Sequence, residues 1–218
     1  MPKKSAGQPS GSITVLAGVN GAGKSSVAGS LVRAAGGEYF NPDEVARSLL
    51  RQNPDLDSAG ANSLAWAQGK NLLERAIAKN EDFVFETTLG GNTLARLLAR
   101  AAKDGMAVKI FFVGLATVEH HLRRVAARVA QGGHDIPEAK IRERWESSRL
   151  NLIRLLPQLA ELMVWDNSAE ADFAKKEPGP VLVLHLKEGK IIAPKNLSAT
   201  PAWAKPIVAA TIQLNRSS

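Results

Sequence analysis

The feature that most constrains this 218-residue chain is a glycine loop, Gly18-Val19-Asn20-Gly21-Ala22-Gly23-Lys24-Ser25. It matches every fixed position of the pattern G-x-x-x-x-G-K-[ST], a loop whose backbone cradles phosphates. The apolar residues 13–17 predict a buried strand before the loop, and residues 26–35 predict a helix after it. Strand, glycine loop and helix form the context that the pattern requires. We therefore expect a nucleoside triphosphate to bind here.

The loop residues share the work of binding the triphosphate. Backbone N–H groups of the loop and of the helix start attract phosphate oxygens. Lys24 would reach the β- and γ-phosphates as a catalytic residue, and the Ser25 hydroxyl would bind Mg²⁺. We thus predict ATP and Mg²⁺ as cofactors. The predicted ATP-binding residues are Gly18, Asn20, Gly21, Ala22, Gly23, Lys24, Ser25 and Ser26.

Strand-like and helix-like segments alternate along the chain, as in parallel βαβ units with helices on both faces of a sheet. The pattern predicts an α/β fold of the P-loop NTPase type, with three α/β/α layers and a mainly parallel five-stranded sheet. The five expected strands are residues 13–17, 38–40, 83–85, 108–115 and 161–165.

The expected domain organisation has three parts. Residues 1–11 predict a flexible tail, and residues 12–168 the P-loop domain. Residues 169–218 would be appended to the same domain as a β-hairpin, turning at residues 187–189, and a weak helix over 202–214 that Pro206 interrupts. We see no internal repeat and no low-complexity tract.

Composition narrows the function classes. The chain has no cysteine, which excludes disulfides and cysteine-based metal sites. No apolar run approaches the ~18 residues of a membrane span, and the N-terminus lacks a signal-like apolar region, so we expect a cytoplasmic protein without membrane contact. The net charge of +7 suits anionic nucleotides, but aromatic residues make up only 5% and do not interleave with the basic clusters, which argues against a nucleic-acid groove.

Three acids lie where a parallel sheet binds ligands, after the carboxyl ends of strands. Asp43 follows the second expected strand, at the start of a helix, where acids are also common for purely structural reasons. Glu86 and Asp166 each end an apolar strand and compete for a role near Mg²⁺. Spacing alone leaves that competition open.

Two arginine-rich helices, over about 117–131 and from 138 onward, are joined by a Gly132-Gly133 break. A single exposed arginine on a helix is best explained as part of a face that contacts solvent. As a group beside a triphosphate, they predict a helical lid over about 117–150, because guanidinium groups bind phosphate oxygens in pairs and stay charged.

Four segments together resemble the zeta-toxin family of P-loop kinases, especially its short bacterial members. They are the glycine loop, Asn41-Pro42-Asp43-Glu44, Phe85-Glu86-Thr87-Thr88, and residues 131–137 followed by the arginine helix. Asp166-Asn167-Ser168 also fits, so the resemblance covers residues 12–168. It departs at Gly90-Gly91, where an arginine is expected.

The resemblance implies transfer of the ATP γ-phosphate to a hydroxyl of a small molecule, UDP-N-acetylglucosamine in the toxins proper. It implies Asp43 as catalytic base, Glu86 and Thr88 in the acceptor pocket, and an antitoxin as a candidate protein partner. It also implies that lid arginines neutralise the triphosphate. The candidates for that role are Arg128, Arg142 and Arg144. The Gly90-Gly91 departure bears on the acceptor and on toxicity, not on the ATP site.

Two other functions stay open. The positive charge is compatible with a polynucleotide or RNA-end kinase. A non-catalytic switch, whose partner reads the ATP-dependent lid state, is a third hypothesis. Asp43 and Glu86 favour the small-molecule kinase, since a non-catalytic switch needs no acids on an acceptor side.

Overall fold

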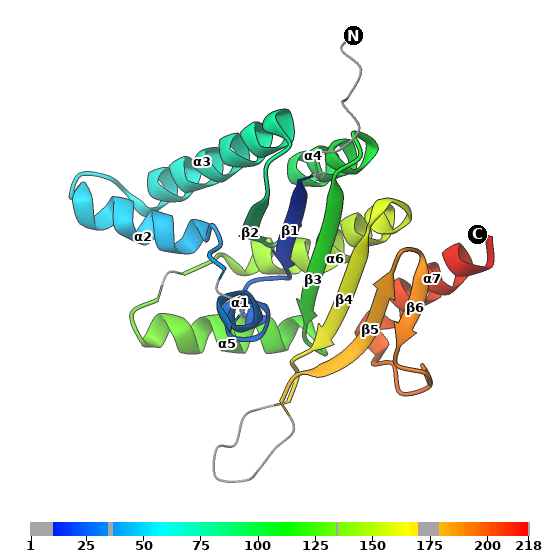
Figure 1. Cartoon of the computed structure of the whole chain (residues 1–218). Helices are drawn as coiled ribbons and strands as arrows, with labels where there is room; N and C mark the ends of the chain where they lie inside the picture. The colour runs from blue at the N-terminus through cyan, green and yellow to red at the C-terminus, as the bar shows by residue number, and fades with distance from the viewer. Residues whose placement is uncertain (1–10, 35–36, 134, 170–178, 218) are drawn as a thin grey trace.

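The computed structural model of the chain describes residues 11–34, 37–133, 135–169 and 179–217 (Figure 1). The expected flexible tail, residues 1–11, lies outside this description except for Gly11. The start of the expected C-terminal part, residues 170–178, lies outside it as well.

A single six-stranded sheet forms the centre of the described chain, in the order β2-β1-β3-β4-β5-β6 (Figure 1). Strands β1 to β4 are parallel, and β5 and β6 are antiparallel. The strands are β1 (Ser12–Ala17), β2 (Phe83–Thr87), β3 (Ala107–Gly114), β4 (Glu161–Asp166), β5 (Val181–Lys187) and β6 (Lys190–Ala193).

The α/β P-loop kinase-like fold is confirmed, but the expected five-stranded, mainly parallel sheet was wrong in detail. The segment 38–40 forms no strand: only Phe40 pairs, in a single parallel bridge with Phe85 at the β2 edge. The hairpin of β5 and β6 turns at Glu188 and Gly189, whose φ angles of 49° and 74° suit a tight two-residue turn. It extends the sheet by two antiparallel strands beyond β4.

Helices cover both faces of the sheet. Helix α1 packs on one face, while α4, α6 and α7 cover the other, and α2 and α3 pack together beyond the β2 edge (Figure 1). The helices are α1 (Lys24–Ala34), α2 (Pro42–Gln52), α3 (Ser58–Lys79), α4 (Asn92–Lys103), α5 (Val118–Ala130), α6 (Glu138–Leu155) and α7 (Lys205–Ser217), with short 3-10 turns at Leu156–Gln158 and Ala202–Ala204.

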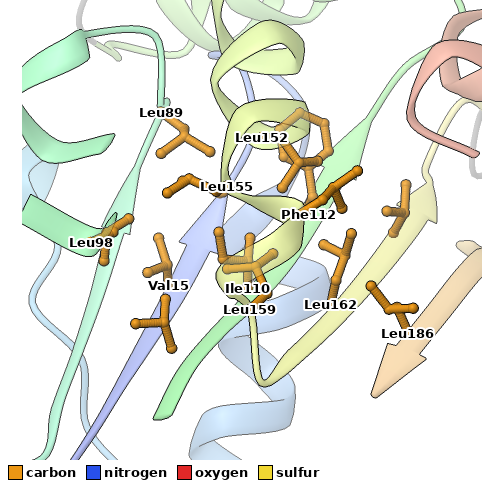
Figure 2. Close-up of a cluster of buried hydrophobic side chains, with 14 of the residues drawn as sticks. Val15, Leu89, Leu98, Ile110, Phe112, Leu152, Leu155, Leu159, Leu162 and Leu186 are labelled. Carbon is orange, nitrogen blue, oxygen red and sulfur yellow. The ribbon is translucent and has the colours of Figure 1, made fainter. Parts of the chain in front are cut away.

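The larger core lies between the sheet and α6 (Figure 2). Side chains alternate across a strand, so Val15 and Ile110 face α6. There they meet Leu152 and Leu155 of α6 and Leu98 of α4, all nearly inaccessible to solvent (Figure 2). On the opposite face Leu16 and Val113 pack with Val27 of α1. The carboxyl half of α6 is therefore part of the core.

The last helix corrects one expectation. Pro206 does not interrupt a helix over 202–214; it lies in the first turn of α7, after the 3-10 turn at Ala202–Ala204. A proline is tolerated in the first turn because its missing N–H would have no helical partner there. Trp203 and Ile207 of this segment are buried in the main core.

Candidate functional site

The loop between β1 and α1 has the backbone that a phosphate cradle needs. Gly18, Gly21 and Gly23 have φ angles of 141°, 80° and 84°, which side-chain-bearing residues rarely adopt. At Gly18 a Cβ would also collide with the carbonyl oxygen of Val113. The chain then enters α1 at Lys24, so that the helix N-terminus follows the loop directly. We call residues 18–25 the P-loop.

Lys24 and Ser25 meet one of the two competing acids. The Lys24 Nζ lies 3.4 Å from Oε1 of Glu86, and the Ser25 hydroxyl donates to Glu86 Oε2 at 2.9 Å. Glu86 stands near the end of β2, which pairs directly with β1. Asp166 ends β4, separated from β1 by β3, and accepts hydrogen bonds from Ser168. Glu86, and not Asp166, is thus the acid beside the P-loop.

These side chains fit Mg²⁺ held together with a nucleotide. Mg²⁺ binds oxygen ligands and usually combines one or two carboxylates with waters and substrate phosphates. Ser25 and Glu86 offer a hydroxyl and a carboxylate side by side. Within the described ranges no group of three or more His, Cys, Asp or Glu residues could hold a metal alone. A magnesium ion here would combine Ser25 and Glu86 with water and phosphate oxygens.

Asp43 is placed by a helix cap. The Asn41 side chain accepts a hydrogen bond from the Asp43 N–H at 3.0 Å, which starts α2 next to the end of β2. Asp43 lines a cavity of about 270 Å³, which we call the Asp43 cavity, and its carboxylate lies 3.5 Å from Nη1 of Arg128. The residues that line the cavity are Asp43, Ala46, Arg47, Leu50, Asn62, Arg128, Gln131, Gly132 and Gly133.

The three candidate lid arginines have different surroundings. Arg144 points to the P-loop, where its Nη1 donates to Asn20 Oδ1 at 2.8 Å. Burial lowers the pKa of Arg144, and the charges of Glu143 and Asp43 oppose that shift. Arg142 instead pairs with Glu138 at 2.8 Å and Glu119 at 3.1 Å in an exposed position. Two residues apart on a helix, Arg142 and Arg144 face nearly opposite sides, so Arg142 does not join Arg128 and Arg144.

The expected lid helices both contact the P-loop region. Val125 of α5 packs with Val19 of the P-loop and Ile141 of α6. Farther along α6, Ser148 donates to the Thr88 carbonyl, and Asn151 donates to the Leu89 carbonyl at 2.9 Å. Opening and closing of a lid over 117–150 stays a prediction. Any such motion has to spare the second half of α6, which belongs to the core.

Thr88 and Glu86, which the resemblance places in one acceptor pocket, line two cavities that share Trp66, Thr87 and Leu94. Their role in binding an acceptor stays a prediction. The cavity lined by Thr88, which we call the Thr88 cavity, has a volume of about 270 Å³ and is also lined by Trp66, Lys140 and Arg144. Glu86 lines the other cavity and also contacts the P-loop. Gly90 closes the Thr88 cavity against the stem of Arg144, whose Cγ lies where a Cβ of residue 90 would need space. The glycine that departs from the zeta-toxin pattern thus makes room for Arg144.

Comparison with known proteins agrees with this architecture. The family model AAA_33, described as an AAA domain, matches residues 13–149, more than half of the chain. This chain belongs to the AAA_33 family. An uncharacterized protein of Haemophilus influenzae is 33% identical to it over 128 residues, which cover 59% of this chain and 88% of that protein.

Solved structures share the fold of this AAA_33 chain at low sequence identity. The AvrRxo1-ORF1:-ORF2 complex with ATP has a TM-score of 0.64 at 16% identity, covering 92% of this chain and 63% of that one. A structure of the PezAT chromosomal toxin-antitoxin system of Streptococcus pneumoniae has a TM-score of 0.54 at 14% identity, covering 98% of this chain and 88% of that one. Identities this low establish the fold and leave the zeta-toxin assignment a proposal.

Three residues at the P-loop of this AAA_33 chain were not predicted from the sequence. His121 Nδ1 lies 2.9 Å from the Asn20 carbonyl oxygen, and the Asn167 side-chain amide donates to the Ala22 carbonyl at 2.9 Å. Arg124 donates to the Asn167 carbonyl at 2.8 Å. The position of Asn167 just after β4, at the same sheet edge, was a usable signal. His121 offered none, because its burial depends on how α5 packs.

The described helices include none that is both long and apolar enough to cross a membrane.

Proposed function

We propose that this chain is an ATP-dependent kinase that transfers the γ-phosphate to a hydroxyl of a small molecule bound in the Asp43 cavity. The observation that carries the proposal is the position of Asp43. Asp43 lines this cavity beside Arg128, and its charge acts on Arg144, which contacts the P-loop. A carboxylate facing a cavity beside a phosphate site can receive a hydroxyl proton.

On the nucleotide side, we assign the triphosphate to the P-loop N–H groups and to Lys24. Magnesium, bound through Ser25 and Glu86 together with the phosphates, would neutralise charge that develops on the phosphate oxygens. We therefore assign Glu86 to nucleotide binding rather than to the acceptor pocket that the resemblance implies. The pair that it forms with Lys24 keeps both side chains in place beside the P-loop.

On the acceptor side, Asp43 would orient the hydroxyl and take its proton while the hydroxyl oxygen forms a bond to the γ-phosphorus. The bond from that phosphorus to the bridging oxygen breaks, and ADP leaves with the electron pair. Arg128 and Arg144 would stabilise the charge on the transferred phosphoryl group, since both stand near Asp43 and guanidinium groups pair with phosphate oxygens. We assign no such role to Arg142.

For the acceptor, we propose a small molecule of the zeta-toxin type, with UDP-N-acetylglucosamine as the first candidate. The quoted motifs support this choice, and the likeness to the PezAT structure supports the fold that it requires. The sequence departs from the zeta-toxin pattern at Gly90, where Arg144 packs in the space that a side chain would need. A different hydroxyl compound is therefore the second candidate.

A protein partner in the cytoplasm completes the proposal. The PezAT structure belongs to a toxin-antitoxin system, and the AvrRxo1 structure is an ORF1:ORF2 complex, which supports looking for a partner of this chain. We expect such a partner to be encoded next to it and to copurify with it. Purification of the tagged chain alone, with unchanged ADP release on adding the neighbouring gene product, would count against this part.

The experiment that tests the reaction measures ADP release with Mg-ATP, alone and with UDP-N-acetylglucosamine, for wild type and Asp43→Asn. Stimulation by the sugar nucleotide in wild type only would support the proposal. Stimulation that survives Asp43→Asn would reject Asp43 as the base. Labelling of oligonucleotide ends would favour the polynucleotide kinase, and tight ATP-controlled partner binding without any phosphorylated product would favour the switch.

A further inference from the structure

The P-loop has to keep its carbonyl oxygens away from the phosphates that it binds. Its N–H groups attract phosphate oxygens, whereas a carbonyl oxygen turned inward would repel them. Inside the loop, the Val19 carbonyl accepts from the Ala22 N–H at 3.1 Å, and the Gly23 carbonyl accepts from N–H groups of α1. The Asn20 and Ala22 carbonyls are instead bonded by side chains from outside the loop.

His121 holds the first of these carbonyls. Its Nδ1 lies 2.9 Å from the Asn20 oxygen, and since that oxygen can only accept, the imidazole carries its proton on Nδ1. The side chain is completely buried, and its Nε2 has no hydrogen-bond partner in the described part of the chain. One function of this imidazole is therefore visible in its contacts: it donates to the P-loop backbone.

A series of aromatic and cationic side chains holds the imidazole in turn. The edge of His121 meets Trp145 at a ring-centre distance of 5.4 Å, and the Arg149 guanidinium stacks 4.3 Å over Trp145. Arg149 also donates to the Trp203 carbonyl at 3.4 Å. Trp203 belongs to the C-terminal segment and packs on Gly114 at the end of β3, where a side chain would collide with the indole.

We propose that His121 is a positioning residue for the nucleotide phosphates, which keeps the Asn20 carbonyl turned away from them, and that the C-terminal segment supports it through Trp203. The inference rests on the proposed nucleotide site, but not on the acceptor. It assigns a role to the segment 181–217, for which the sequence suggested no chemistry. Asn167 has the corresponding role for the Ala22 carbonyl, to which it donates a hydrogen bond from the end of β4.

The test measures the dissociation constant of Mg-ADP by calorimetry in the full-length chain, together with the melting temperature. His121→Ala should raise the dissociation constant about fivefold, the effect of one net hydrogen bond. His121→Asn should recover most of the affinity, because the Asn Nδ2 occupies the position of the imidazole Nδ1. His121→Gln, whose amide reaches farther, should not.

The C-terminal support has its own matched pair of variants. Trp203→Phe keeps the carbonyl that Arg149 binds but removes part of the indole that packs on Gly114 and holds this carbonyl in place. It should raise the Mg-ADP dissociation constant about threefold, less than the loss of the His121 hydrogen bond itself. Ile207→Ala removes a fully buried side chain of the same segment that is not part of the series. It should lower the melting temperature and leave the Mg-ADP affinity unchanged.

Some outcomes would overturn the inference. Equal Mg-ADP affinity in wild type, His121→Ala and His121→Gln would do so, as would loss of affinity in Ile207→Ala equal to that in Trp203→Phe. A wild-type chain that binds no Mg-ADP would overturn both this inference and the proposed function. A wild type that binds Mg-ADP but phosphorylates no acceptor would reject only the proposed reaction, because the affinities above are measured without an acceptor.

Discussion

The P-loop region and the Asp43 cavity lie next to each other but are built in different ways. At the P-loop, Asn20, Lys24 and Glu86 are only 6%, 7% and 8% exposed, and each contacts a partner on another element. In the cavity, the Asp43 and Arg128 side chains are 40% and 39% exposed and meet at 3.5 Å. The first region is a closed network, and the second is an open cavity.

This difference suits the two substrates that we propose for these regions, a nucleotide at the P-loop and an acceptor in the Asp43 cavity. A triphosphate is the same in every kinase, so its site can be fixed by backbone and buried contacts. An acceptor differs between kinases, and the side chains that we propose to meet it, Asp43 of α2 and Arg128 of α5, line the open Asp43 cavity. Substitutions in the P-loop region should therefore affect nucleotide binding and stability, whereas those in the cavity should affect transfer alone.

The largest effect is expected for Lys24→Met. It removes a charge that would contact the transferred phosphate, and turnover should fall by roughly 10³-fold. It also leaves the buried Glu86 carboxylate without its cation, so the melting temperature should fall. The double variant Lys24→Met/Glu86→Gln should recover stability but not turnover. Recovery of turnover in the double variant would mean that Lys24 acts only through Glu86.

The second effect separates the two regions. Asp43→Asn should lower acceptor-dependent turnover about 10²-fold, because an amide cannot take the hydroxyl proton. Mg-ADP affinity, measured by calorimetry, should stay unchanged. Glu44→Gln is the matched control, since this acid lies in the same first turn of α2 and contacts the Asn41 cap. An equal loss in both variants would point to the helix start rather than to Asp43.

The third effect tests the burial of His121 beside the P-loop, through the pH dependence of the free energy of unfolding. Burial, together with the charges of Lys24 and Arg124, lowers the pKa of His121 from 6.5 to about 4, although the hydrogen bond to Asn20 acts in the opposite direction. Between these pH values the unfolded chain binds a proton that the folded chain does not. Stability should therefore fall as the pH drops from 6.5 to 4, by at most about 3 kcal/mol, and level off below.

Denaturant unfolding at several pH values measures this dependence. His121→Asn, which has no imidazole to titrate, should lose that part of the slope while it keeps a donor for the Asn20 carbonyl. Parallel curves for wild type and variant would contradict a buried His121 imidazole that stays uncharged between these pH values.

The smallest effect concerns the arginines of α6. Arg144→Ala removes the contact with Asn20 and should lower kcat/KM about tenfold. Arg142→Ala, two residues away, breaks only exposed ion pairs and should change kcat/KM less than twofold. Steady-state rates at several acceptor concentrations compare the two. A larger loss for Arg142→Ala would restore it to the lid group.

The sequence predicted the parts that depend on local patterns. The P-loop and the strands β1 to β4, apart from their ends, follow from apolar runs and glycine positions. The predicted strand over residues 38–40 was wrong, because only Phe40 pairs with the sheet. Its single bridge to Phe85 places Asn41 at the sheet edge. Pairing of this kind depends on tertiary contacts rather than on local sequence.

The parts of the site that depend on packing were less predictable. Helix periodicity could have separated Arg142 from Arg144, but not shown which of them faces Asn20. The choice between Glu86 and Asp166 needed the strand order, which places β2 and not β4 beside β1. The contact of His121 with the P-loop depends on the packing of α5 against that loop, which the local sequence does not determine.

The most direct test of the account follows the γ-phosphate of labelled Mg-ATP incubated with the wild-type chain, UDP-N-acetylglucosamine and a pool of small hydroxyl compounds. We predict that the label appears on one small organic acceptor and that Asp43→Asn abolishes this transfer while it still binds Mg-ADP. Label found only in inorganic phosphate, or only on oligonucleotide ends, would contradict a small-molecule kinase with its acceptor in the Asp43 cavity.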